Sequence, residues 1–182
     1  MPRYVALLRA INVGGRTVKM DKLRALFETL ELRNVETLIA SGNVLFDSTA
    51  KDVPALETRI ERHLEKSLGY KVETFVRTAA ELAGVVKGTP FAGSKVHTEA
   101  NALYVGFLKE TAAKEMKDRV VALCNDTHEF RVVGREYYWS SRTSMGQSPD
   151  MNAALGKAVK VPSTVRNITT VRKLAELAAG GA

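Results

Sequence analysis

The sequence predicts an α+β protein in which short strands alternate with amphipathic helices. Apolar runs rich in Val, Leu, Ile and Phe have the composition of buried strands. Segments with apolar residues at helical spacing separate these runs, and Gly, Pro and Ser mark the transitions between them. With 182 residues, of which 45% are hydrophobic, the chain is long enough to bury a substantial core.

The first half of the chain predicts the element order β-α-β-β-α-β, which is that of a ferredoxin-like unit. The expected strands cover residues 3–9, 35–40, 43–47 and 71–77. The first helix is expected to begin near Asp21 and the second to cover 53–68, where Leu and Ile recur every fourth position. Gly69 supplies a C-terminal stop for the second helix.

The second half predicts a related but incomplete unit. A helix near 79–87 comes first, and the later elements are a strand at 102–108, a helix at 111–124, a hairpin that turns at Gly134 and helices near 150–159 and 167–178. From residue 102 onward the order is β-α-β-β-α, which lacks the last strand of the first half. We therefore expect a ferredoxin-like subdomain at 1–78, packed with a second α+β subdomain at 79–182 that ends in C-terminal helices.

Basic residues are concentrated near both ends of the chain. The net charge is +7, and residues 1–24 hold six basic side chains against Asp21 alone. Residues 131–173 hold eight basic side chains against two acidic ones. Such an excess is typical of a surface that binds anionic ligands, although a solvated basic surface has the same composition.

The stretch that follows the first strand, "LRAINVGGR", predicts an anion-binding turn. Paired glycines at Gly14 and Gly15 can direct backbone N–H groups toward one point, and Arg9 and Lys19 flank them. A nucleoside-triphosphatase loop is excluded, because Ala10 replaces its first glycine and the helix starts too late to hold a phosphate. A simple tight turn is the alternative.

Two further polar motifs are candidate parts of the same site. Ser41 and Asn43 lie between two strands, and the ferredoxin-like order would place them beside the first strand and its outgoing loop. Arg166 and Asn167 precede the last predicted helix, where a guanidinium would meet an anion at the positive helix end. We predict that the glycine turn and Arg166 share one electropositive pocket.

Three ordered motifs, "LRAINVGG", "ASGNVLF" and "TVRNITTVRKL", resemble the bacterial DUF1697 family, a domain family of unknown function. The resemblance implies an α+β fold with ferredoxin-like parts and no established activity. It carries the motif residues over to Arg9, Asn12, Gly14, Gly15, Ser41, Gly42, Asn43, Arg166 and Asn167. The chain departs from the family pattern at Ala10, Ala40 and Ile168, where Gly, Gln and Trp are usual.

A separate pattern is similar to that of RNA-recognition domains. Tyr137 and Trp139 occupy alternate positions of one strand, and Tyr104 would face them from a neighbouring strand. In such domains exposed aromatic rings stack on bases. The alternative is that these rings are buried in the core.

Several classes of function lack support in the sequence. His63, His97 and His128 are scattered without metal-ligand spacing, so we expect no metal and no cofactor. A single cysteine, no secretory signal and no long apolar run favour a cytoplasmic protein without membrane association.

The leading hypothesis is a binding protein for a phosphate-bearing ligand, either a nucleotide or a nucleic acid. A small enzyme of unknown chemistry, with a polar cleft of Ser, Asn and Arg, is a first alternative. A structural or oligomerising module that pairs through an aromatic face is a second. Whether the protein is an enzyme, and its oligomeric state, stay open.

Overall fold

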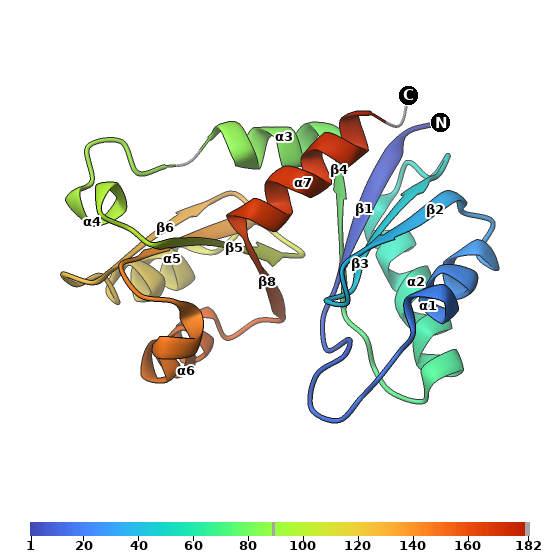
Figure 1. The fold of residues 1–182 in the computed structure, drawn as a ribbon, viewed down its shortest axis with the longest axis horizontal. Helices are drawn as coiled ribbons and strands as arrows, with labels where there is room; N and C mark the ends of the chain where they lie inside the picture. The colour runs from blue at the N-terminus through green and yellow to red at the C-terminus, as the bar shows by residue number, and fades with distance from the viewer. Residues whose placement is uncertain (89, 181–182) are drawn as a thin grey trace. The chain divides into compact units, whose positions relative to one another are not determined.

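The fold is described from a computed structural model that covers residues 1–88 and 90–180 (Figure 1). The chain divides into two compact units. Unit 1 comprises Met1–Gly84 together with the chain from Arg172 onward, and unit 2 comprises Val85–Val171. The division therefore falls at Gly84 rather than at residue 78, and the C-terminal part of the last helix groups with unit 1.

Unit 1 has the predicted order β-α-β-β-α-β. Its elements are β1 (Arg3–Leu8), α1 (Met20–Glu28), β2 (Arg33–Leu38), β3 (Asn43–Asp47), α2 (Val53–Leu68) and β4 (Thr74–Thr78). The strands form an antiparallel sheet of order β2-β3-β1-β4, so β1 and β3 are central neighbours. Leu7 pairs with Asn43 in this register, which confirms the predicted approach of the Ser41–Asn43 segment to the end of the first strand.

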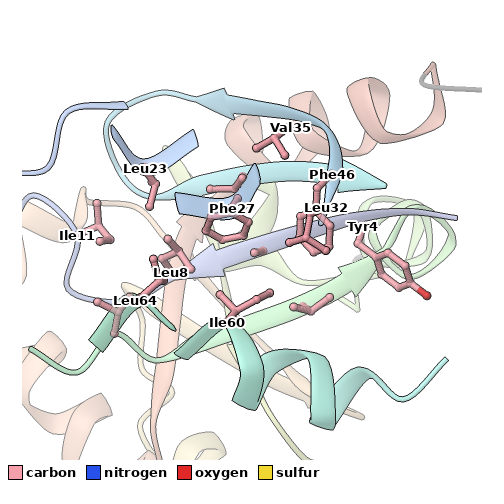
Figure 2. Packing of buried hydrophobic residues seen from close by; sticks show 14 of the residues in the cluster. Tyr4, Leu8, Ile11, Leu23, Phe27, Leu32, Val35, Phe46, Ile60 and Leu64 are labelled. Carbon is pink, nitrogen blue, oxygen red and sulfur yellow. The ribbon is translucent and has the colours of Figure 1, made fainter. Parts of the chain in front are cut away.

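The core of unit 1 lies between this sheet and helices α1 and α2 (Figure 2). Alternate residues of the strands face the helices, including Tyr4 and Leu8 of β1 and Phe46 of β3. Phe27 of α1 and Ile60 of α2 pack against them, and both are fully buried. Burial of each such side chain contributes about 1.5–3 kcal/mol to folding. Because this burial stabilises the fold, the alternating and helical patterns of apolar residues in the sequence were sufficient to predict these elements.

Helix α2 has its predicted bounds because both of its ends are capped. The Asp52 carboxylate accepts a hydrogen bond from the Ala55 N–H at 3.0 Å, and Pro54 lies in the first turn. Gly69 ends the helix in the left-handed conformation, with φ of 80°. Helix α1, in contrast, begins at Met20 after Lys19, which provides no side-chain cap.

Unit 2 repeats the β-α-β-β-α-β order in full. Its elements after the short helix α4 (Lys95–Thr98) are β5 (Ala102–Leu108), α5 (Lys114–Val121), β6 (His128–Val133), β7 (Glu136–Ser141), α6 (Pro149–Val159) and β8 (Ser163–Asn167). A single 3₁₀ turn at Met145–Gln147 precedes α6. The sheet order is β6-β7-β5-β8, which matches the order in unit 1. Helices α3 (Ala79–Lys87) and α7 (Ile168–Ala179) complete the chain.

The prediction that the second unit lacks its last strand is wrong. Residues Ser163–Asn167 form β8, which pairs antiparallel with β5 along its whole length. The sequence was interpreted as a series of helix caps because Ser, Thr and Asn are typical cap residues. In the strand, the buried Thr164 and Arg166 alternate with the half-buried Ser163 and Val165, and these residue types do not reveal that alternation in the sequence.

The core of unit 2 is built around Trp139, which is fully buried. Its ring lies 5.6 Å from that of Phe130 in a stacked geometry and 5.4 Å from that of Tyr104. The neighbouring Tyr137 ring crosses β5 at Gly106, and its hydroxyl lies 3.1 Å from Ser163 Oγ on β8. Apolar residues of α5 and α6 cover these rings.

Within the described residues, none of the helices is both long enough and apolar enough to span a membrane.

Candidate anion-binding site

The Gly14–Gly15 pair forms a tight turn in the exposed connection between β1 and α1. Gly14 and Gly15 have φ of 60° and 81°, and the Arg16 N–H donates to the Val13 carbonyl at 3.1 Å. These values match a type I′ turn, in which both central residues need positive φ. The need for positive φ at both positions therefore accounts for the two glycines, as the tight-turn alternative predicts.

The turn presents backbone N–H groups that the protein itself does not use. Residues 13–17 are exposed, and the N–H groups of Val13, Gly14 and Gly15 have no hydrogen-bond partner among residues 1–88 and 90–180. No atom lies within 4 Å of the position that a Cβ would take on either glycine. A ligand can therefore approach the backbone closely at this turn.

The loop that contains the turn carries basic side chains, and one of them contacts an aromatic ring. The Arg16 guanidinium lies over the Tyr70 ring, with Cζ 4.5 Å from the ring centroid. A stacked guanidinium keeps the N–H groups along its edge available for hydrogen bonds. Lys19 is exposed and precedes α1.

Arg9 is tied to the connection between α2 and β4. Its Nη1 lies 2.6 Å from Glu73 Oε2, and its backbone N–H donates to the Glu73 carbonyl at 2.8 Å. Lys71 Nζ lies 3.7 Å from the other oxygen of the Glu73 carboxylate. Glu73 therefore offsets part of the positive charge, while it fixes the base of the loop.

Asn12 has a structural role as well as a place in the motif. Its side-chain amide donates to the carbonyls of Ala40 at 2.8 Å and Val18 at 3.2 Å, and its Oδ1 accepts from the Val18 N–H at 2.7 Å. These three bonds close the loop and join it to the turn between β2 and β3. Asn12 itself has φ of 54°, a conformation that asparagine adopts more readily than most residues.

The Ser41–Asn43 segment packs against the end of β1 and the start of the loop. Asn43 is fully buried, and its amide donates to the Leu38 carbonyl at 3.0 Å and to Ser41 Oγ at 2.9 Å. The Gly42 carbonyl accepts from the Leu8 N–H at 2.8 Å. A Cβ on Gly42 would lie 3.0 Å from the Cβ atoms of Leu8 and Ile11, so only glycine permits this approach. The buried Asn43 thus holds the turn rather than facing a cleft.

The predicted shared pocket stays a prediction, because Arg166 belongs to unit 2 and the glycine turn to unit 1. Arg166 lies in β8, two residues before α7 begins at Ile168, and its Nη1 donates to Thr164 Oγ1 at 2.7 Å. Burial lowers the pKa of this guanidinium to about 10. Asn167 caps α7 instead, because its Oδ1 accepts from the Thr169 N–H at 2.8 Å.

The three aromatic residues considered for base stacking belong to the core of unit 2. Tyr137 and Trp139 are 2% and 0% exposed, so neither ring presents a face to solvent. The half-buried Tyr104 uses its hydroxyl to accept from the Met145 N–H at 2.9 Å. Base stacking, and pairing between copies of the chain, both need exposed rings. These residues instead lie in the core, as the alternative interpretation predicts.

Sequence reasoning missed Tyr70 and Glu73 because their roles depend on a contact between distant segments. Both lie in the connection between α2 and β4, which carried no motif of its own. Figure 1 shows this connection and the loop after β1 at the same end of the first sheet. In the part of the chain that the structure describes, no cluster of three or more His, Cys, Asp or Glu side chains could hold a metal ion.

Comparisons with known proteins identify the family but not an activity. A conserved bacterial protein from Streptococcus pneumoniae, SP0830, has a similar structure, with a TM-score of 0.72 and 23% identity over 98% of this chain and 99% of that one. At this identity the likeness shows the fold alone. No curated protein matched the sequence. The model of the DUF1697 family, proteins of unknown function, matches residues 1–138, and this chain belongs to that family.

Proposed function

We propose that this protein binds a phosphate-bearing ligand, a nucleotide or a nucleic acid, at the exposed loop between β1 and α1. The observation that carries the proposal is the row of unbonded N–H groups at Val13, Gly14 and Gly15, next to the stacked Arg16 guanidinium. Backbone amides and guanidinium groups together are the donors that phosphate oxygens favour in proteins.

The charge around the loop is suited to an anion. Arg9, Arg16, Lys19 and Lys71 are basic, and Glu73 is the acidic residue that pairs with two of them. A ligand with several negative oxygens could contact both the turn amides and the basic side chains. A catalytic role for the polar residues of the neighbouring turn has less support, since Asn43 is fully buried and hydrogen-bonded within that turn.

The test is a thermal-shift and calorimetric titration with three probes: pyrophosphate, ADP and a short single-stranded RNA. A ligand that binds the native state alone raises the melting temperature by mass action. Arg16→Gln should weaken binding of the preferred probe about tenfold, as expected for the loss of a charged hydrogen bond. Arg62→Gln removes the same charge from the exposed surface of α2 and should leave binding unchanged.

Salt dependence separates the two kinds of ligand. Binding of RNA should weaken steeply with added salt because counterions are released from the strand, whereas binding of ADP should change much less. If none of the three probes raises the melting temperature at millimolar concentration, or if Arg16→Gln binds as well as the wild type, the proposal is wrong.

A further inference from the structure

Unit 2 contains a cavity of about 540 Å³. The residues that line it belong to unit 2, and the loop between β1 and α1 of unit 1 is not among them. It opens between the connection from β5 to α5 and the connection from α6 to β8. Its apolar wall is formed by Leu108, Ala112, Met116, Val159, Val161 and Pro162. This volume and apolar lining are typical of sites for small organic molecules.

One charged side chain of the lining is fixed and lacks a counter-ion. The Nε group of Arg119 donates to the Ala158 carbonyl near the end of α6 at 2.9 Å, which orients the guanidinium. No carboxylate in the described chain lies within 4.0 Å of this guanidinium. Its terminal N–H groups are therefore available to a ligand.

The cavity lining carries charges of both signs. Arg119 is half-buried, whereas Glu110 and Glu115, which also line the cavity, are exposed. Lys109 and Lys160 add two further positive charges, from the connections after β5 and α6. Three cations thus oppose two exposed glutamates, whose charges solvent screens, so the lining favours an anionic group.

The start of α5 adds donors to the same cavity. Ala113 is the N-cap of this eight-residue helix, and it has no side chain that could accept the first N–H groups. Ala113, Glu115 and Met116 all line the cavity. An acceptor oxygen placed there would be stabilised by the positive end of the helix.

The two units use the same topological position in different ways. In unit 1, the connection before the last strand supplies Tyr70, whose ring contacts Arg16 of the loop after the first strand. In unit 2, the corresponding connections enclose the cavity instead. The corresponding connections therefore hold an arginine–tyrosine contact in unit 1 and line a cavity in unit 2.

We infer that this cavity binds a small monocarboxylate with an apolar body, whose carboxylate pairs with Arg119 and whose apolar part lies against Met116 and Val161. Charge complementarity favours this class over a neutral or cationic one, since the lining has more cationic than anionic side chains. The apolar wall favours it over a small inorganic anion.

The test uses three probes that share one alkyl chain and differ in charge: octanoate, 1-octanol and octylammonium. Isothermal titration of the full chain should show octanoate binding at least tenfold more tightly than the other two. Arg119→Gln should remove this preference and leave the affinity for octanol within about twofold. Lys117→Gln, on the same helix but outside the cavity lining, should keep the preference.

A second pair of variants tests the location. Val161 is 52% exposed at the cavity, and Val161→Trp should weaken binding of both octanoate and octanol by filling the space. Val121, 42% exposed on α5 and outside the lining, gives the matched control Val121→Trp. Circular dichroism confirms that each variant is folded.

Three results would overturn the inference. One is octanoate binding no more tightly than octanol, and another is Arg119→Gln weakening both probes equally while remaining folded. The third is Val161→Trp and Val121→Trp having the same effect on binding.

Discussion

The guanidinium of Arg16 lies over the ring of Tyr70, with Cζ 4.5 Å from the ring centroid. This contact joins the glycine loop to the residue that follows the end of α2. Tyr70→Leu should weaken pyrophosphate binding several-fold, because an aliphatic side chain keeps the apolar packing but lacks the π face that attracts the guanidinium. Calorimetric titration measures the change.

Tyr70→Phe is the matched control for this prediction. The Tyr70 hydroxyl is buried without a hydrogen-bond partner in the described chain, so its removal should leave binding intact and should not lower stability. Equal losses of affinity in Tyr70→Phe and Tyr70→Leu would show that the ring face does not position Arg16.

Gly14→Ala tests whether the shape of the turn matters for binding. The new Cβ meets no atom, but φ of 60° costs a non-glycine residue about 1–2 kcal/mol, so the turn should shift and pyrophosphate affinity should fall. Gly134→Ala imposes the same strain at φ of 59° in the hairpin of unit 2, and it should lower the melting temperature without a loss of affinity. If the two variants bind pyrophosphate with similar affinities, the shape of the turn at Gly14 does not matter for binding.

Ala10→Gly should stabilise the protein. Ala10 has φ of 64°, a conformation that glycine adopts without the steric cost that a Cβ brings. Relief of the strain should outweigh the added entropy of the unfolded chain and leave a gain of about 0.5–1 kcal/mol. Ala153→Gly in the exposed middle of α6 makes the same chemical change and should destabilise by about 1 kcal/mol. Chemical denaturation of both variants would show these opposite signs, and a destabilised Ala10→Gly would contradict the strain argument.

Gly106→Ala should be among the most damaging single substitutions in unit 2. A Cβ at Gly106 would lie 1.9 Å from Tyr137 Cζ, so the ring would have to leave its place over the strand. Overpacking of this kind costs about 1–3 kcal/mol. Tyr137→Ala also destabilises by loss of packing, but the double variant should be more stable than the sum of the two losses. Simple additivity in denaturant unfolding would contradict the proposed clash.

Acidification should weaken the fold through His128. Burial lowers the pKa of His128 below its usual 6.5, and Nδ1 accepts a hydrogen bond from Trp139 Nε1 at 3.2 Å and lies 2.9 Å from Ser141 Oγ. The unfolded chain therefore takes up a proton that the folded protein resists, so stability is full above pH 6.5 and falls as the pH drops toward the folded pKa. Unfolding measured between pH 7.5 and about 5 should show this slope, with a smaller slope in His128→Gln. An unchanged slope in that variant would assign the effect to other groups.

The elements predicted from the sequence were those whose pattern is set by local chemistry. The bounds of α2 follow from its repeating apolar residues and Gly69, and the hairpin from its turn at Gly134. The missed strand, β8, is rich in Ser, Thr and Asn, which favour caps locally. Pairing with β5 overrides this preference, and a single sequence does not reveal such pairing.

The candidate site was predicted only in part, for the same reason. Arg9, Gly14 and Gly15 are close in sequence, so their motif could be recognised. Tyr70 and Glu73 join the loop only through the packing of α2 and β4 against β1. The aromatic pattern of β7 was ambiguous because a strand alternates its two faces in the same way whether the rings are buried or exposed.

The central claim, that an anion binds the amides of the glycine turn, is tested most directly by nuclear magnetic resonance. In a titration of ¹⁵N-labelled protein with pyrophosphate, the amide signals of Val13, Gly14 and Gly15 should shift along a saturable curve. The same shifts should be strongly reduced in Arg16→Gln and retained in Arg62→Gln. Signals of these three amides that stay unmoved while the probe shifts others, or that move without saturation, would contradict the claim.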